Sequence, residues 1–167
     1  MSNRIMDSKA EELDMKTGLA RANREKLSHH LSKALSDTYV LLVKTQGVHW
    51  NVAGPLFYSL HKMTEEHYED LFAAADDIAE RIRAIGFGAP GTFAQFAELA
   101  SVRENAHLGT TEDMVQQLAE DNEVCARTMR EAALEAEKVE DIKTHDLLTD
   151  RVGQHEENAW MLRALLA

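Results

Sequence analysis

The chain has 167 residues, of which 44% are hydrophobic and 28% are charged. This length and composition suit one folded domain and are not typical of a disordered chain. The formal net charge of −11 argues against non-specific nucleic-acid binding by the folded body, because neutralising phosphates requires an excess of Lys and Arg. The single cysteine, Cys125, excludes an internal disulfide and indicates a reducing compartment.

Long apolar segments are absent from the sequence. No stretch reaches the roughly 18 uninterrupted apolar residues of a membrane span, and residues 1–15 lack the apolar run of a secretory signal. Aromatic residues make up only 6% of the chain, whereas Ala, Leu and Glu are abundant, which favours helices over a β-sandwich. The sequence therefore predicts a soluble, cytoplasmic, all-α protein with no membrane partner.

Hydrophobic periodicity predicts four long helices, at about residues 23–50, 55–85, 110–137 and 144–165. A long connection with a short amphipathic segment, about 92–100, joins the second helix to the third. Two short links and one long crossover are the connectivity of ferritin-like four-helix bundles. We expect residues 1–22 to form a flexible amino-terminal tail and residues 23–167 to form the bundle domain.

Four polar residues of the second predicted helix share one arc of its surface, beside the apolar stripe: His61, Glu65, Asp76 and Glu80. At 3.6 residues per turn they lie within about 100° of one another. Each i,i+4 pair, His61 with Glu65 and Asp76 with Glu80, can offer two ligands to a metal. His61 and Asp76 are about 22 Å apart along the helix, at roughly 1.5 Å per residue, so a single chain cannot bind one metal with both.

Two antiparallel copies of this helix could combine the two pairs. His61 with Glu80 and Glu65 with Asp76 are both centred between residues 70 and 71, so a two-fold axis there would bring the pairs together. Aromatic residues on the same arc suggest burial of this face by another chain. His49, at the end of the first helix, could complete a set of two imidazoles and three carboxylates, which suits iron.

Structural alternatives remain open for parts of this pattern. An isolated acid–histidine pair at i,i+4 is often a solvated helix face, and a histidine that ends an apolar stripe, as His49 does, is often a hydrogen-bonded core residue. An intrachain di-iron ferritin site needs an ExxH motif on each of two helices, and the chain has one match, at residues 104–107. A structural zinc site of four Cys or His ligands is also disfavoured, because the single cysteine lies on a different helix.

The sequence HWNVAGPLFYSLHKMTEE (49–66), followed by DDIAERIRAIG (76–86), resembles the signature of the Dps family, the mini-ferritins. The similarity continues in GTFAQFAELA (91–100) and HEENAWMLRALL (155–166). It implies a hollow homo-dodecameric shell with a ferroxidase centre for two iron ions at each two-fold interface. His49, His61 and Glu65 would come from one subunit and Asp76 and Glu80 from the other. Many members of the family have Asp at the position of Glu65.

The resemblance also implies an activity. The protein would oxidise Fe(II), preferentially with hydrogen peroxide rather than oxygen, and store the Fe(III) mineral in its cavity, which protects DNA from hydroxyl radicals. Trp50, next to His49, is expected near the site as an electron donor, with simple packing at the interface as the alternative. Three acids at the start of the last helix lie where the family lines its three-fold pores: Asp146, Asp141 and Asp150.

DNA binding is the alternative function that the resemblance implies, through an amino-terminal tail at the nucleoid. Residues 1–26 contain six basic and five acidic residues, a net charge of +1. Lys-rich tails bind DNA in the members that do so. We therefore expect weak DNA binding here, even if twelve tails add avidity.

Overall fold

The computed structural model describes residues 12–104 and 107–167. These residues form five helices: α1 (Arg21–Asn51), α2 (Phe57–Ala84), α3 (Phe93–Leu99), α4 (Thr111–Lys138) and α5 (Ile142–Ala164). The predicted all-α class, the four long helices and the short helix in the crossover are confirmed, and the boundaries agree to within a few residues. None of the helices in the described ranges is long and apolar enough to cross a membrane.

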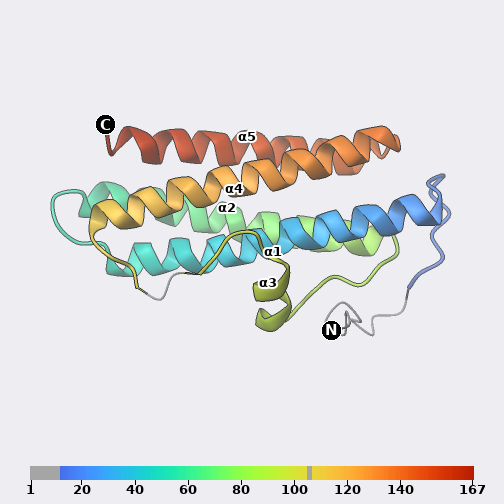
Figure 1. The fold of residues 1–167 in the computed structure, drawn as a ribbon, viewed down its shortest axis with the longest axis horizontal. Coiled ribbons are helices and arrows are strands. Elements are labelled where there is room, and N and C mark those ends of the chain that lie inside the picture. Colours follow the sequence, from blue (N-terminus) through green and yellow to red (C-terminus); the bar gives the residue numbers. More distant parts are fainter. Residues whose placement is uncertain (1–11, 105–106) are drawn as a thin grey trace.

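The four long helices form a bundle in which α1 packs against α2, and α4 against α5 (Figure 1). Helices α1 and α4 also pack together, and α3 lies against α1. The crossover returns along the bundle, so α4 begins at the end where α1 stops and α2 starts. The hydroxyl of Thr111, at the start of α4, accordingly donates a hydrogen bond to the carbonyl of Ala53 in the α1–α2 link (3.0 Å).

Side-chain caps define the starts of the later helices. Thr92 begins α3 and Thr110 begins α4, each with a reciprocal capping box in which its hydroxyl accepts from the backbone N–H three residues later. Asp141 caps α5, where its carboxylate accepts from the backbone N–H of Thr144 (3.1 Å). These local interactions explain why the helices start close to the predicted positions.

The core contains two apolar clusters, one toward each end of the bundle. One includes Val48, Leu60 and Leu118, and the other includes Leu31, Ile82 and Met129. Between them lies a buried polar layer contributed by all four long helices: Asp37, Thr38, His67, Thr128, Arg151, His155 and Asn158. Because buried polar groups need partners, this layer constrains how the helices can be aligned.

Asp37 in this layer fixes the crossover to α1. One of its carboxylate oxygens accepts from the backbone N–H groups of Ser101 (2.5 Å) and Val102 (2.9 Å). The segment after α3 is thereby held on the bundle.

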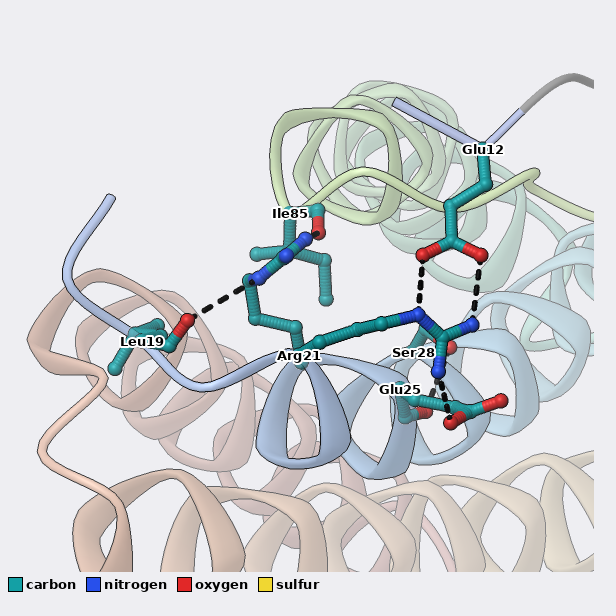
Figure 2. Close-up of polar contacts among 7 residues, drawn as sticks. Glu12, Leu19, Arg21, Glu25, Ser28 and Ile85 are labelled. Carbon is teal, nitrogen blue, oxygen red and sulfur yellow. Dashed lines mark hydrogen bonds and ion pairs between the residues drawn. The ribbon is translucent and has the colours of Figure 1, made fainter. Parts of the chain in front are cut away.

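Residues 12–20, part of the predicted tail, lie against the residues that end and follow α2, and Figure 2 shows the side-chain bonds around Glu12, Leu19 and Ile85. The guanidinium of Arg24 is buried and donates to the carbonyls of Ile85 (2.7 Å) and Leu19 (3.3 Å). The backbone N–H of Leu13 donates to the carbonyl of Gly86 (2.9 Å). Gly86 has φ +102°, and a Cβ there would lie 2.6 Å from the Leu13 oxygen, so only glycine fits without a shift.

Arg21 adds an exposed contact to the same segment. Its guanidinium makes two hydrogen bonds of 2.7 Å to Glu12 and one of 2.9 Å to Glu25 (Figure 2). Within the predicted tail, residues 12–20 therefore pack on the bundle through the hydrogen bonds of Glu12, Leu13 and Leu19. Residues 1–11 lie outside the described part of the chain.

Candidate metal centre

The end of α1 and the first turns of α2 bring His49 and His61 together. Their rings are stacked, with centroids 3.9 Å apart and planes at 17°. Nδ1 of His49 lies 2.9 Å from the carbonyl oxygen of His61, and Nδ1 of His61 lies 3.1 Å from the carbonyl oxygen of His49. A carbonyl only accepts, so both Nδ1 atoms donate, which leaves Nε2 of each ring as the nitrogen that can bind a metal. This is the arrangement that orients a histidine for metal binding.

Three neighbouring side chains hold the two rings in place. Phe57 stacks on His61 with centroids 5.2 Å apart, and the ring of Tyr68 lies nearly perpendicular to that of His49, with centroids also 5.2 Å apart. The hydroxyl of Thr64 donates to the carbonyl of Leu60 (2.6 Å) and lies 3.4 Å from Nδ1 of His49. Sequence reasoning did not assign these roles. The three residues lie four positions before and three and seven positions after His61. These spacings place them on the same face of the helix as His61, which was the signal in the sequence.

Glu65 lies near the histidine pair, but its carboxylate is bound to a lysine. Nζ of Lys62 is 2.7 Å from Oε2 of Glu65. The Lys62 ammonium lowers the pKa of the Glu65 carboxyl, and His49 and His61 lower it further to a smaller extent. Glu65 is therefore within electrostatic reach of both imidazoles.

Asp76 and Glu80 are exposed on the same helix and have no hydrogen bond or ion pair with any described residue. Because α2 is continuous from Phe57 to Ala84, they cannot approach the histidine pair within one chain. Accordingly, no three His, Cys, Asp or Glu side chains within residues 12–104 and 107–167 are close enough to hold a metal ion. The structure brings His49 and His61 together, places Glu65 nearby and leaves Asp76 and Glu80 apart.

Large aromatic side chains are exposed around these residues. Trp50, adjacent to His49, is 69% exposed, and Phe72, midway along α2, is 66% exposed. Tyr58 is also exposed. Exposed apolar side chains gathered near polar ligand residues are typical of a surface that another chain covers.

The acids at the start of α5 differ in their surroundings. Asp146 and Asp150 are exposed, and Asp146 pairs with Lys143 (3.1 Å). Asp141 is buried, accepts from the Thr144 hydroxyl (2.6 Å) and binds Arg81 (2.6 Å). This corrects the prediction that Asp141 lines a pore, because its carboxylate is used inside the subunit as a cap and ion-pair partner.

The comparisons with known proteins agree with this fold. The family model of the ferritin-like domain matches residues 28–167, which defines the chain as a ferritin-like protein. The chain is 38% identical to the DNA protection during starvation protein 2 of Bacillus anthracis, over 81% of this chain and 93% of that protein. The identity to the DNA protection during starvation protein of Helicobacter pylori is 33%, over 79% and 92% of the two chains.

Solved structures with a similar fold are Dps proteins. The Dps protein from Vibrio cholerae O1, described as a member of a broad superfamily of ferritin-like diiron-carboxylate proteins, matches with a TM-score of 0.87 and 28% identity over 92% of this chain and 96% of that chain. DpsC from Streptomyces coelicolor matches with a TM-score of 0.89 and 26% identity over 94% and 92%. The chain belongs to the Dps family of ferritin-like proteins.

Proposed function

We propose that this protein is a cytoplasmic mini-ferritin that oxidises Fe(II), preferentially with hydrogen peroxide, at sites shared between two subunits. It stores the Fe(III) product as mineral inside a shell of twelve subunits. The histidine pair carries this proposal: Nδ1 of both His49 and His61 is engaged by a carbonyl, and no described residue hydrogen-bonds either Nε2. The donor set of imidazole nitrogen and carboxylate oxygen fits iron.

Each site takes two iron ions as substrate. One subunit supplies His49, His61 and Glu65, and the two-fold axis between residues 70 and 71 adds Asp76 of the partner subunit and Glu80 of the partner subunit. Two features support this arrangement: Asp76 and Glu80 have no partner among the described residues, and aromatic side chains are exposed on the same surface.

The chemistry follows from two metal ions held close together. Each Fe(II) loses one electron, and hydrogen peroxide takes up both electrons and two protons to give two water molecules, so no hydroxyl radical is released. Imidazoles favour the Fe(II) substrate, and carboxylates stabilise the Fe(III) product. Trp50, exposed beside His49, is the proposed electron donor for oxidising equivalents that escape this reaction.

Iron must enter the shell before it reaches these sites. We assign this role to Asp146 and Asp150, whose exposed carboxylates on α5 could form rings around a three-fold pore. Such rings attract cations and focus the field at the opening. The relatives named for DNA protection are consistent with the outcome, because removal of Fe(II) and peroxide together prevents radical damage to DNA.

A subunit-mixing experiment tests the shared site. His61→Ala and Asp76→Ala should each lower peroxide-dependent Fe(II) oxidation by at least about tenfold, because each removes a ligand from every site. In shells assembled from equal amounts of the two variants, half of the two-fold pairs combine one chain of each kind. One of the two sites in such a pair is intact, so about a quarter of the wild-type activity should return.

The double variant His61→Ala/Asp76→Ala, assembled alone, is the matched control and should stay inactive. If the mixture forms shells but is no more active than its parents, the ligands are not shared between subunits. If the double variant oxidises Fe(II) at the wild-type rate, the assignment of the site residues is wrong.

DNA binding by the tail is the weaker alternative. Of the six basic residues within 1–26, Arg21 and Lys26 form ion pairs with acids of the chain and Arg24 binds backbone carbonyls. These three side chains are engaged within the folded subunit. Lys16 makes an exposed ion pair with Asp14 (4.0 Å), and Arg4 and Lys9 lie outside the described residues.

A further inference from the structure

We propose that Lys62 is the resident counter-cation of the metal site: without metal its ammonium occupies the Glu65 carboxylate, and a metal ion must displace it to bind. The direct observation is the 2.7 Å contact between Nζ of Lys62 and Oε2 of Glu65. This inference rests on the proposed two-subunit site.

The contact is one that a metal ion can break. The side chains of Lys62 and Glu65 are 53% and 34% exposed, and the ammonium has no other hydrogen-bond or ion-pair partner among the described residues. A lysine on a flexible stem can withdraw into solvent, where it is well hydrated. An exposed pair of this kind is weak, so it lowers the affinity for metal without preventing metal binding.

The charge of the surrounding sequence makes Lys62 unusual. From Thr45 to Glu80, the stretch that contains all five proposed ligands, Lys62 is the only Lys or Arg, against seven acidic residues. Every other basic side chain of the first two helices lies outside this stretch. Asp70, another acid of this stretch, binds Arg151 of α5 (2.6 Å), so Lys62 is the cation of this stretch that contacts a proposed ligand.

The two-fold arrangement increases the need for such a cation. Each shared site would gather Glu65, Asp76 of the partner subunit and Glu80 of the partner subunit, three like charges beside the two imidazoles. With the axis between residues 70 and 71, position 62 would lie opposite position 79, which precedes Glu80 of the partner subunit in sequence. Repulsion between unpaired carboxylates at an interface opposes association, and one ammonium reduces it.

Lys62 thus has two opposite effects: it stabilises the metal-free interface and weakens metal binding. Replacing it with Gln, which keeps much of the length and removes the charge, should tighten Co(II) binding about twofold to fivefold, the range for an exposed ion pair. The same change should lower the thermal midpoint of the metal-free shell, and Co(II) should restore it. The difference in affinity should shrink at high salt, because exposed charges are screened.

The experiment is a titration of metal-free assembled protein with Co(II), followed by calorimetry and by the visible absorption of the bound ion. Lys138→Gln is the matched control, because the exposed Lys138 also contacts a glutamate three residues away on its own helix α4, Glu135 (2.6 Å), which pairs with Lys26 as well. It should leave Co(II) affinity unchanged. Lys62→Arg keeps the charge and should bind Co(II) like the wild type. His61→Ala should lose the binding event.

These variants separate the two proposals. If His61→Ala binds Co(II) like the wild type, the site itself is misassigned. If His61→Ala loses binding while Lys62→Gln binds no more tightly than the wild type, the counter-cation role is wrong and the shared site stands. A Lys62→Gln chain that assembles only with Co(II) supports the role, whereas one that fails to assemble under both conditions contradicts it.

Discussion

His155 links the buried polar layer to the pH range in which the bundle is stable. Its side chain is fully buried, and its Nδ1 lies 2.9 Å from Oδ1 of Asn122. Burial lowers the pKa of His155 to about 3, and the nearby Arg151 guanidinium contributes in the same direction, against the opposing effect of Asp70. The imidazole therefore stays neutral in the folded protein at pH values where it takes up a proton in the unfolded chain.

The sign of the pH dependence follows from this difference. Between the unfolded pKa near 6.5 and the folded value, the unfolded chain binds about one more proton, so folding stability falls as the pH falls. From pH 7 to pH 5 this single group should cost about 2 kcal/mol of unfolding free energy. In His155→Gln this contribution to the loss should disappear. Urea unfolding of the wild type and the variant at pH 7 and pH 5 measures the four free energies of unfolding.

His67, also buried and with a lowered pKa caused by burial, leaves part of the acid sensitivity in the variant. His29→Gln, at an exposed position of α1, is the control and should keep the full wild-type loss. Equal losses between pH 7 and pH 5 in the wild type and in His155→Gln would show that His155 is not responsible.

At the scale of elements, the segment 12–20 depends on one arginine. In Arg24→Met the carbonyls of Ile85 and Leu19 would lose their buried donor, which should destabilise the protein by about 1–3 kcal/mol. The segment should also loosen, because Arg24 joins it to the end of α2. Hydrogen exchange measures this directly: the amide of Leu13, which donates to Gly86, should exchange faster.

Arg21→Gln is the matched control for this experiment. Arg21 contacts the same segment through Glu12, but both side chains are largely exposed, so the expected cost is at most about 1 kcal/mol. Equal exchange of the Leu13 amide in Arg24→Met and Arg21→Gln would contradict a specific role for the buried guanidinium.

Helices and tertiary contacts differ in how far the sequence predicts them. The helices were predictable because their apolar periodicity and end signals are local. The buried contacts of Arg24 and the carbonyl bonds of His49 and His61 were not, because they depend on where distant backbone carbonyls come to lie. Asp141 differs from these residues: an aspartate three residues before Thr144 is a local capping signal, and this signal indicates a helix cap, not a pore residue.

At the scale of the whole molecule, the sequence predicted a site that no single subunit contains. That inference needed only the straight geometry of α2 and the symmetric placement of His61, Glu65, Asp76 and Glu80 around its middle. It could not predict that Glu65 would contact Lys62, since a surface side chain has several rotamers and the choice depends on local charge. The subunit structure supports the inference of a shared site, because it keeps His61 and Asp76 far apart on one straight helix. The assembled protein provides the test.

The assembled protein should also fail to bind DNA strongly. Each chain has a net charge of −11, and residues 1–11, which lie outside the described structure, contain Arg4 and Lys9 against Asp7 and Glu11. We expect no retardation of linear DNA in a gel-shift assay at about 0.15 M salt, because phosphate binding depends on excess positive charge.

A charge variant shows whether this balance is the cause. Asp7→Asn/Glu11→Gln raises the net charge of residues 1–11 from zero to +2 and leaves Glu12, the partner of Arg21, in place. The variant should retard DNA at low salt and release it as salt increases, with several tails in one shell adding avidity. Retardation of DNA by the wild type as strongly as by the variant would show that DNA contacts do not depend on the charge of the tail, and would place them on the folded body.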